Sequence, residues 1–377
     1  MKTNTEKANQ HYVPKFYLRH FSYLNNLNQI GVFNTKSEFF IKDGKLKKQA
    51  SKKYFYGKDG VLEDFYQNLE NVLSPLMLKY IQNESIPKKF SSEQSDMLHL
   101  IFTMESRNPM RINLMRQALL NQKDRIDKID PTFYNKQKQD VLNQFVKNGN
   151  LHKIMLENLK GRVMLAMDLN FKLLKNTTNN PFITSDFPVV EYNQFMESQN
   201  WFDGINYNGS GWIGQQIFFP LNEQYLLIIF DSDIYKVGNK KESVVELSDT
   251  NSIDSLNILQ FLNCTNNIFF NHSASEHYIR TLFDKSKQYK KGNQLVNYDL
   301  KTMSEDGIKD DNSIILATTT SNIETKLKLE KIKVHSKGKF TKLNDMAIQW
   351  RPKAKQVYEY MEQEKTKQNN DNRYTRQ

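Results

Sequence analysis

Cysteine, glycine and proline are scarce in this 377-residue chain, which contains 1, 14 and 9 of them. The single cysteine, Cys264, excludes an intramolecular disulfide and any zinc site built from several cysteines. The longest strongly apolar run, Tyr225–Phe230, is far shorter than the roughly 20 residues that a membrane-spanning helix needs. The first ten residues are polar, unlike a secretory signal peptide. We therefore expect a soluble, cytoplasmic protein with no membrane partner.

Familiar signatures of nucleotide and nucleic-acid binding are also missing. The sequence has no glycine-rich phosphate loop, no zinc-finger spacing and no signature of the common RNA-binding sheet. The case for a nucleic-acid partner therefore depends on the charge of the chain.

Positive charge is in excess and is concentrated at the two ends of the chain. The 53 lysines and arginines outnumber the 42 acidic residues by 11. Residues 1–60 have a net charge of +8 and residues 331–377 a net charge of +7, so the segment between them is mildly acidic. Basic ends can contact a phosphate backbone, although lysines that are only solvated remain the alternative. The candidate contacts with DNA or RNA are Lys45, Lys47, Lys48, Lys52 and Lys53.

Helical periodicity dominates the first half of the sequence. Apolar residues recur every three or four positions over 62–81, which predicts a helix with one wide buried face. Ser91 followed by Gln94 forms a capping box that opens a second helix. Pro109 should break that helix near Arg107, because proline cannot donate a backbone hydrogen bond. Further helical patterns cover 110–122, 132–147 and 151–175.

The second half has the short apolar runs that are typical of β-strands. The expected strands are 181–183, 189–192, 217–219, 225–230 and 314–318, with helices at 252–262 and 274–283. Two short runs near the N-terminus, 30–33 and 38–41, predict a hairpin. The predicted fold class is therefore α+β, with a helix-rich N-terminal half packed on a small mixed or antiparallel sheet in the C-terminal half.

Five short motifs follow one another along residues 11–285. They are His11-Tyr-Val-Pro14 with Tyr17, Leu18 and Phe21; Glu63 and Glu70; Ser106-Arg107-Asn-Pro109; Phe182-Ile-Thr-Ser-Asp186 with Pro188; and Phe219-Pro-Leu221. Each motif alone is weak, but in this order they resemble one bacterial family, domain of unknown function 4238. The chain departs from the family pattern at Phe187, where such sequences typically have asparagine.

The resemblance implies a division of the chain and a biological setting. Residues 1–285 would form the family core, with a helical part at about 60–176 and a strand-rich part at about 180–285. Residues 286–362 would be a C-terminal extension. Residues 363–377 lack apolar periodicity and are predicted to be a disordered basic tail. The family has no assigned reaction, and its members resemble accessory bacterial genes of phage-defence or toxin systems.

His11 is the first candidate for chemistry. Imidazole can transfer a proton near neutral pH or bind a metal. The nearby Pro14 fixes the backbone that aims the ring. The alternative is a histidine that only holds the N-terminal segment through hydrogen bonds to the backbone.

Two carboxylates share one face of the first long helix. Glu63 and Glu70 are seven positions apart, which separates them by about 20° around the helix axis and about 10.5 Å along it. That separation is too long for the carboxylate pair of a glycosidase. Glu70 lies at the edge of the apolar face, so we expect it to be paired or functional. The alternative for both residues is a solvated polar stripe.

Arg107 lies where the second helix should end. Its guanidinium could bind phosphate or carboxylate through two hydrogen bonds, with Arg111 one turn further on as an assistant. The alternative is a structural ion pair between Arg107 and Glu70.

Asp186 follows a predicted buried strand, and the hydroxyls of Thr184 and Ser185 lie beside it in the sequence. Side chains at the C-terminal ends of strands often meet ligands. The alternative is an aspartate that only closes a turn.

These residues suggest two classes of function. In the first, the protein is a nuclease-like effector, in which His11 acts as general acid or base and Arg107 stabilises charge at phosphorus. Glu70 and Asp186 then orient the histidine or hold a divalent metal ion. In the second, the protein is a non-catalytic ligand-sensing or protein-binding module with a structural polar network. Both classes predict that the four side chains converge, and the sequence identifies neither cofactor nor substrate.

Overall fold

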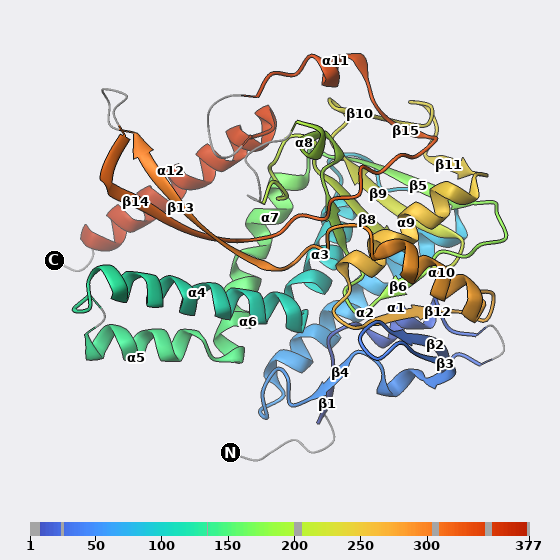
Figure 1. The fold of residues 1–377 in the computed structure, drawn as a ribbon, viewed down its shortest axis with the longest axis horizontal. Helices are drawn as coiled ribbons and strands as arrows, with labels where there is room; N and C mark the ends of the chain where they lie inside the picture. The colour runs from blue at the N-terminus through green and yellow to red at the C-terminus, as the bar shows by residue number, and fades with distance from the viewer. Residues whose placement is uncertain are drawn as a thin grey trace.

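Two β-sheets form the body of the protein, on the right of Figure 1. The computed structural model describes residues 8–23, 26–133, 135–199, 206–303, 309–343 and 349–374. The larger sheet has the order β11-β5-β9-β8-β7, which are Val244–Leu247, Asn170–Asn176, Tyr225–Phe230, Gln216–Pro220 and Val190–Tyr192. Only β11 and β5 are parallel, so the sheet is mixed. The smaller, antiparallel sheet has the order β3-β2-β12-β6, which are Phe39–Lys45, Gln29–Asn34, Asn267–Phe270 and Thr184–Ser185.

The larger sheet is covered on both faces. Tyr225, Leu227 and Ile229 of β9 pack into one hydrophobic core with α3 (Ser92–Ser106). Leu226, Ile228 and Phe230 pack into the other core with α9 (Thr250–Asn263). Because alternate side chains of a strand point to opposite faces, a strand buried on both sides must be apolar throughout. This accounts for the apolar run over β9.

The helices of the first half follow the predicted periodicity. They are α2 (Val61–Gln82), α3, α4 (Pro109–Ile129), α5 (Lys136–Phe145), α6 (Asn148–Glu157) and α7 (Leu159–Ala166). The hydroxyl of Ser91 accepts a hydrogen bond from the amide of Gln94, which caps α3. The predicted break before Pro109 is present, and the side chain of Asn108 caps α4 by accepting from the amide of Met110. The α+β fold class is confirmed.

Residues 170–175, predicted to be the end of a helix, form β5 instead. Phe171, Leu173 and Leu174 are all buried, and a short apolar run of this kind fits a buried helix or a buried strand equally well. Pairing with β9 on one side and β11 on the other decides in favour of the strand. The strand predicted at 181–183 also lies slightly further on, as β6 at Thr184–Ser185.

The N-terminal segment belongs to the same body as the C-terminal half. The predicted hairpin is present as β2 and β3, and β2 pairs with β12 from the C-terminal half of the chain. Ahead of it, β1 (Asn9–His11) pairs with β4 (Ser51–Lys53). The short helices α1 (Lys15–Arg19) and η2 (Leu46–Lys48) complete this segment. Residues far apart in the sequence therefore build one sheet.

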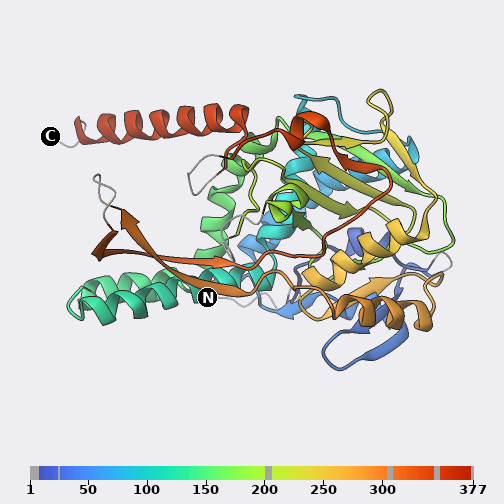
Figure 2. The same ribbon diagram turned by 45° about the horizontal axis from the view of Figure 1, so that its top comes forward.

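Helices α4 and α5, helix α12 and the β13–β14 hairpin extend to one side of the body (Figure 1 and Figure 2). The hairpin strands are Leu295–Met303 and Lys309–Thr320, and α12 is Pro352–Tyr374. The predicted disordered tail is thus helical from 363 to 374, and residues 375–377 lie outside the described residues. At the start of α12 the rings of Trp350 and Tyr358 stack with centroids 4.8 Å apart.

The remaining elements are α8 (Gln194–Ser198), β10 (Tyr235–Val237), α10 (Glu276–Ser286), β15 (Ile332–Val334) and α11 (Ser336–Lys339). Within the described ranges, no helix has both the length and the apolar composition needed to span a bilayer.

Candidate functional site

Arg107 is the centre of a buried polar cluster at the C-terminal end of α3. Its Nη1 pairs with Oε1 of Glu70 at 2.6 Å, and its Nε donates to the backbone oxygen of Tyr12 at 3.1 Å. The guanidinium lies 5.1 Å from the ring centroid of Tyr66. The residue is completely buried, and among the described residues its Nη2 has no hydrogen-bond partner. The ion pair with Glu70 therefore leaves one side of the guanidinium unused.

His11 lies at the edge of the same cluster, on β1. Its backbone oxygen accepts a hydrogen bond from the hydroxyl of Tyr56. The next residue, Tyr12, accepts a hydrogen bond from Arg107 through its backbone oxygen. The ring Nε2 is 3.2 Å from the backbone oxygen of Lys47, a contact that requires the proton on Nε2 and leaves Nδ1 as an acceptor. Partial burial lowers the pKa of His11 to about 4, with smaller contributions from the charges of Lys15 and Arg107. The ring is therefore neutral at pH 7.

The five candidate lysines lie close to His11. Lys52 and Lys53 are on β4, directly opposite the residues that precede His11 on β1. Lys47 and Lys48 lie on η2, Lys45 directly precedes it, and the backbone oxygen of Lys47 contacts the imidazole. All five side chains are exposed. We call these five exposed lysines, which lie on the strand and the short helix next to β1, the lysine surface.

Asp186 is placed differently. Its carboxylate accepts from the backbone amides of Thr265, Asn266 and Asn267 at 2.8, 3.0 and 3.0 Å. Among the described residues it has no hydrogen bond or ion pair with the Arg107 cluster, which consists of Arg107, Glu70, Tyr12 and Tyr66. It is almost fully buried, and this burial raises its pKa to about 6. Its backbone oxygen accepts a hydrogen bond from the side-chain amide of Asn108, the residue after Arg107, and this bond links the two regions. The aspartate closes the turn before β12.

The hydroxyls beside Asp186 are part of the core. Oγ1 of Thr184 is 2.7 Å from the hydroxyl of Tyr17, and Oγ of Ser185 donates to Oε1 of Gln260 at 2.8 Å. Neither Thr184 nor Ser185 is accessible to solvent. Their positions indicate a role in holding β6 between its neighbours.

The other carboxylate of the predicted pair, Glu63, is half-buried on α2, and its charge contributes to the raised pKa of Tyr66, for which burial is the main cause. Within the described part of the chain, no three His, Cys, Asp or Glu side chains meet in a group that could hold a metal ion. The contacts of Asp186 with backbone amides give no geometry for a divalent ion shared with Glu70.

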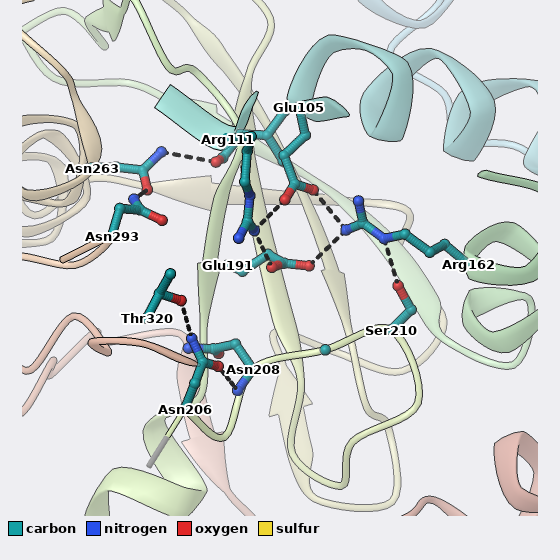
Figure 3. Close-up of polar contacts among 12 residues, drawn as sticks. Glu105, Arg111, Arg162, Glu191, Asn206, Asn208, Ser210, Asn263, Asn293 and Thr320 are labelled. Carbon is teal, nitrogen blue, oxygen red and sulfur yellow. Dashed lines mark hydrogen bonds and ion pairs between the residues drawn. The ribbon is translucent and has the colours of Figure 1, made fainter. Parts of the chain in front are cut away.

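A second polar cluster, which the sequence analysis did not predict, lies beyond the break between α3 and α4 (Figure 3). Both Glu105 and Glu191 pair with both Arg111 and Arg162, and the distance from Nη2 of Arg162 to Oε2 of Glu105 is 2.7 Å. The Glu105 side chain is only 1% exposed. Its two arginine neighbours lower the pKa of this carboxylate against the opposing effect of burial. We call these four residues the double ion pair.

The double ion pair explains the position of Arg111. This residue was predicted to assist Arg107, but its guanidinium binds Glu105 and Glu191 instead. One sequence signal could have revealed the pairing: Glu105 follows a run of apolar residues at the end of α3. A carboxylate at the end of such a buried stretch needs a charged partner.

A cleft adjoins Arg111 and is lined on its polar side by asparagines. The polar part has a volume of about 20 Å³, and its wall includes Asn206, Asn208, Asn263 and Asn293. A separate hollow of about 190 Å³ also has Arg111 in its wall and is bounded by α4, α6 and the β13–β14 hairpin. We call these two neighbouring hollows, which share Arg111, the Arg111 cleft.

His152 is a further buried residue that the sequence analysis missed. It lies on α6 with its ring 5.0 Å from the ring of Tyr56, and neither of its nitrogens has a partner among the described residues. Burial lowers its pKa to about 4, and the charges of Arg107 and Arg116 act in the same direction. The histidine is therefore neutral at pH 7 and belongs to the surroundings of Arg107.

The geometry defines an α+β protein with two buried arginine–glutamate clusters and a basic surface near its N-terminus. The chain belongs to the family described as Protein of unknown function (DUF4238), whose sequence pattern matches residues 9–274. This confirms the family that the sequence predicted. No curated protein and no solved structure matches the chain.

Proposed function

We propose that this protein is a cytoplasmic, nuclease-like effector that acts on DNA or RNA in a bacterial phage-defence or toxin system. The observation that supports the proposal is the lysine surface on the segments next to a half-buried, neutral His11. A nucleic-acid strand held by these lysines would bring its phosphates next to the imidazole.

The protonation state of His11 suits a general base. Nδ1 can accept a proton while Nε2–H is held by the backbone oxygen of Lys47. In the free protein a pKa of about 4 makes the imidazole a weak base. A bound phosphate brings negative charge to the ring and raises that pKa towards neutral pH, so the base becomes effective once substrate is present.

Arg107 has a supporting role in this proposal. It is completely buried, and its contacts with Glu70 and the backbone of Tyr12 fix the segment that carries His11. Asp186 is a structural residue here, because its carboxylate is occupied by backbone amides. We assign no metal ion to the reaction, and His11 is the residue on which the chemistry depends.

A salt titration tests nucleic-acid binding. Reversing Lys45, Lys47 and Lys48 to Glu should weaken binding to labelled single-stranded DNA or RNA and lower the dependence of log Kd on log salt. The matched control reverses Lys333, Lys337 and Lys339, which are exposed on β15 and around α11, far from β1 in Figure 1. Both triple variants change the net charge by the same amount. Equal loss of binding in the two variants would show that only overall charge matters.

A cleavage assay tests the chemistry. His11→Ala should abolish cleavage of the bound strand and leave the urea unfolding midpoint unchanged, whereas His277→Ala, at an exposed position on α10, should cleave normally. A wild-type protein that binds neither DNA nor RNA would favour the alternative, a non-catalytic ligand-sensing or protein-binding module. Loss of stability in His11→Ala without loss of cleavage would show that the histidine is structural.

A further inference from the structure

The Arg111 cleft combines a polar end with an aliphatic section. Around the polar end, Figure 3 shows Arg111, Glu191 and the asparagine side chains arranged about one space. Next to it, the larger hollow is lined by aliphatic side chains of α4, α6 and the start of β13 and by a run of threonines on β14. The aliphatic lining residues are Leu114, Met115, Ala118, Met155 and Leu295.

The asparagines are held in place by their neighbours. Nδ2 of Asn206 donates to Oγ1 of Thr320 at 2.7 Å, and Nδ2 of Asn293 donates to Oδ1 of Asn263 at 2.9 Å. Asn208 is fixed in the same way by a bond of 3.2 Å to the side chain of Asn322. Amides anchored at one end present their remaining edges in fixed directions, which reduces the entropy lost when a ligand binds.

Two buried polar atoms beside the cleft have no partner among the described residues. One is a donor, Nε of Arg111, and the other is an acceptor, Oδ1 of Asn208. Buried polar atoms are rarely left without a hydrogen bond to protein or to an ordered water, so an unpaired donor and acceptor indicate that a water molecule or a polar group of a ligand completes them. The complementary group must itself offer both an acceptor and a donor.

The charge of the site indicates a neutral ligand group. Arg111 and Arg162 are balanced by Glu105 and Glu191 within the double ion pair, so the wall of the cleft has no net charge to attract an anion. An anion or a cation in this place would also lose its hydration without a compensating partner.

We propose that the Arg111 cleft binds a nucleobase, as a free nucleoside or as part of a nucleotide. A base is neutral, and its edge carries donors and acceptors side by side, which asparagine and arginine side chains recognise. Its flat faces pack between apolar side chains, as those of the larger section would allow. The volume of about 190 Å³ is below that of sites for drug-sized molecules, which suits a ligand of this size.

This site is separate from the proposed nuclease site, because none of its lining residues belongs to the lysine surface or the Arg107 cluster. The two proposals can therefore fail independently. The variant with Lys45, Lys47 and Lys48 reversed to Glu should bind nucleosides as the wild type does.

Calorimetric titration of the full chain tests the inference with adenosine, guanosine, cytidine and uridine, one at a time, and with ribose as the control. We expect saturable binding of at least one nucleoside with a Kd below about 1 mM and none of ribose. If no nucleoside binds, or if ribose binds as tightly as the best of them, the cleft is not a nucleobase site.

Two variants locate the binding in the cleft. Ala118→Leu adds a branched side chain to the cleft wall and should weaken binding at least tenfold, whereas Gln117→Leu, at the exposed neighbouring position, should not. Asn293→Gly removes one side-chain amide from the wall of the cleft and should weaken nucleoside binding about tenfold. Glycine suits this position because the backbone φ of Asn293 is 61°. Binding that is unchanged in both Ala118→Leu and Asn293→Gly would overturn the assignment.

Discussion

The double ion pair predicts a large difference between two glutamates on the same helix. Glu105 and Glu93 both lie on α3 and both have a basic partner. The Glu105 side chain is 1% exposed, whereas the side chains of the Glu93–Lys79 pair are 36% and 47% exposed. We expect Glu105→Gln to lower the free energy of unfolding by about 3 kcal/mol. For Glu93→Gln we expect a loss below about 1 kcal/mol.

The larger loss of stability expected for Glu105→Gln has two causes. Replacing the carboxylate by an amide removes the negative charge between Arg111 and Arg162, so that Glu191 alone must balance two partly buried guanidinium groups. The amide also keeps only one acceptor oxygen, so its NH₂ group faces a guanidinium donor. Breaking a buried pair by changing one partner typically costs about 3–5 kcal/mol, because the remaining charge stays buried.

Urea denaturation of both variants, followed by circular dichroism at pH 7, measures the difference. The slope of the unfolding transition should be unchanged, so that the shift in midpoint reports stability. If Glu105→Gln lost less than about 1 kcal/mol, as expected for Glu93→Gln, the double ion pair would not be a buried and tightly coupled unit.

Three further predictions concern pH, a helix cap and the C-terminal helix. The pKa values of His11, His20 and His152 are each lowered to about 4 by burial, so the unfolded state binds more protons below pH 6.5. The free energy of unfolding should therefore fall as the pH drops from 6.5 to 4. The raised pKa of Asp186 offsets only part of that loss. Denaturation midpoints at pH 7.5, 6 and 5 measure the change in stability. Asn108→Ala removes the α4 cap and a buried bond to the backbone of Asp186 and should cost about 2 kcal/mol. The exposed cap variant Asn135→Ala should cost about 1 kcal/mol or less, and equal losses in urea denaturation would contradict the importance of the buried bond. Ending the chain after Gln363 should leave the melting temperature unchanged, because the described packing of α12 involves its first turns. Arg351→Met should lower the melting temperature, because it removes the hydrogen bonds from the guanidinium to Asp168 and to three backbone oxygens.

Local patterns in the sequence predict the helices of the first half and most of the strands of the second. The break at Pro109 and the cap at Ser91 are determined by a few neighbouring residues, so they can be found without the fold. The five family motifs likewise need only their order along the chain. The segment 170–176 could not be assigned in this way, because its apolar pattern is compatible with a buried helix or a buried strand.

For the candidate site, too, some features follow from the local sequence and others only from the tertiary structure. The sequence by itself identified His11, Glu70 and Arg107 as polar residues in positions that require partners, and the pairing of Glu70 with Arg107 was one of its two readings. Only the tertiary structure decided that Arg111 turns to Glu105 and Glu191, and that the Asp186 carboxylate binds the turn before β12. The physical reason is that a buried charge needs a partner, but nothing in the local sequence specifies which of several distant partners the packing of helices and strands will bring within reach.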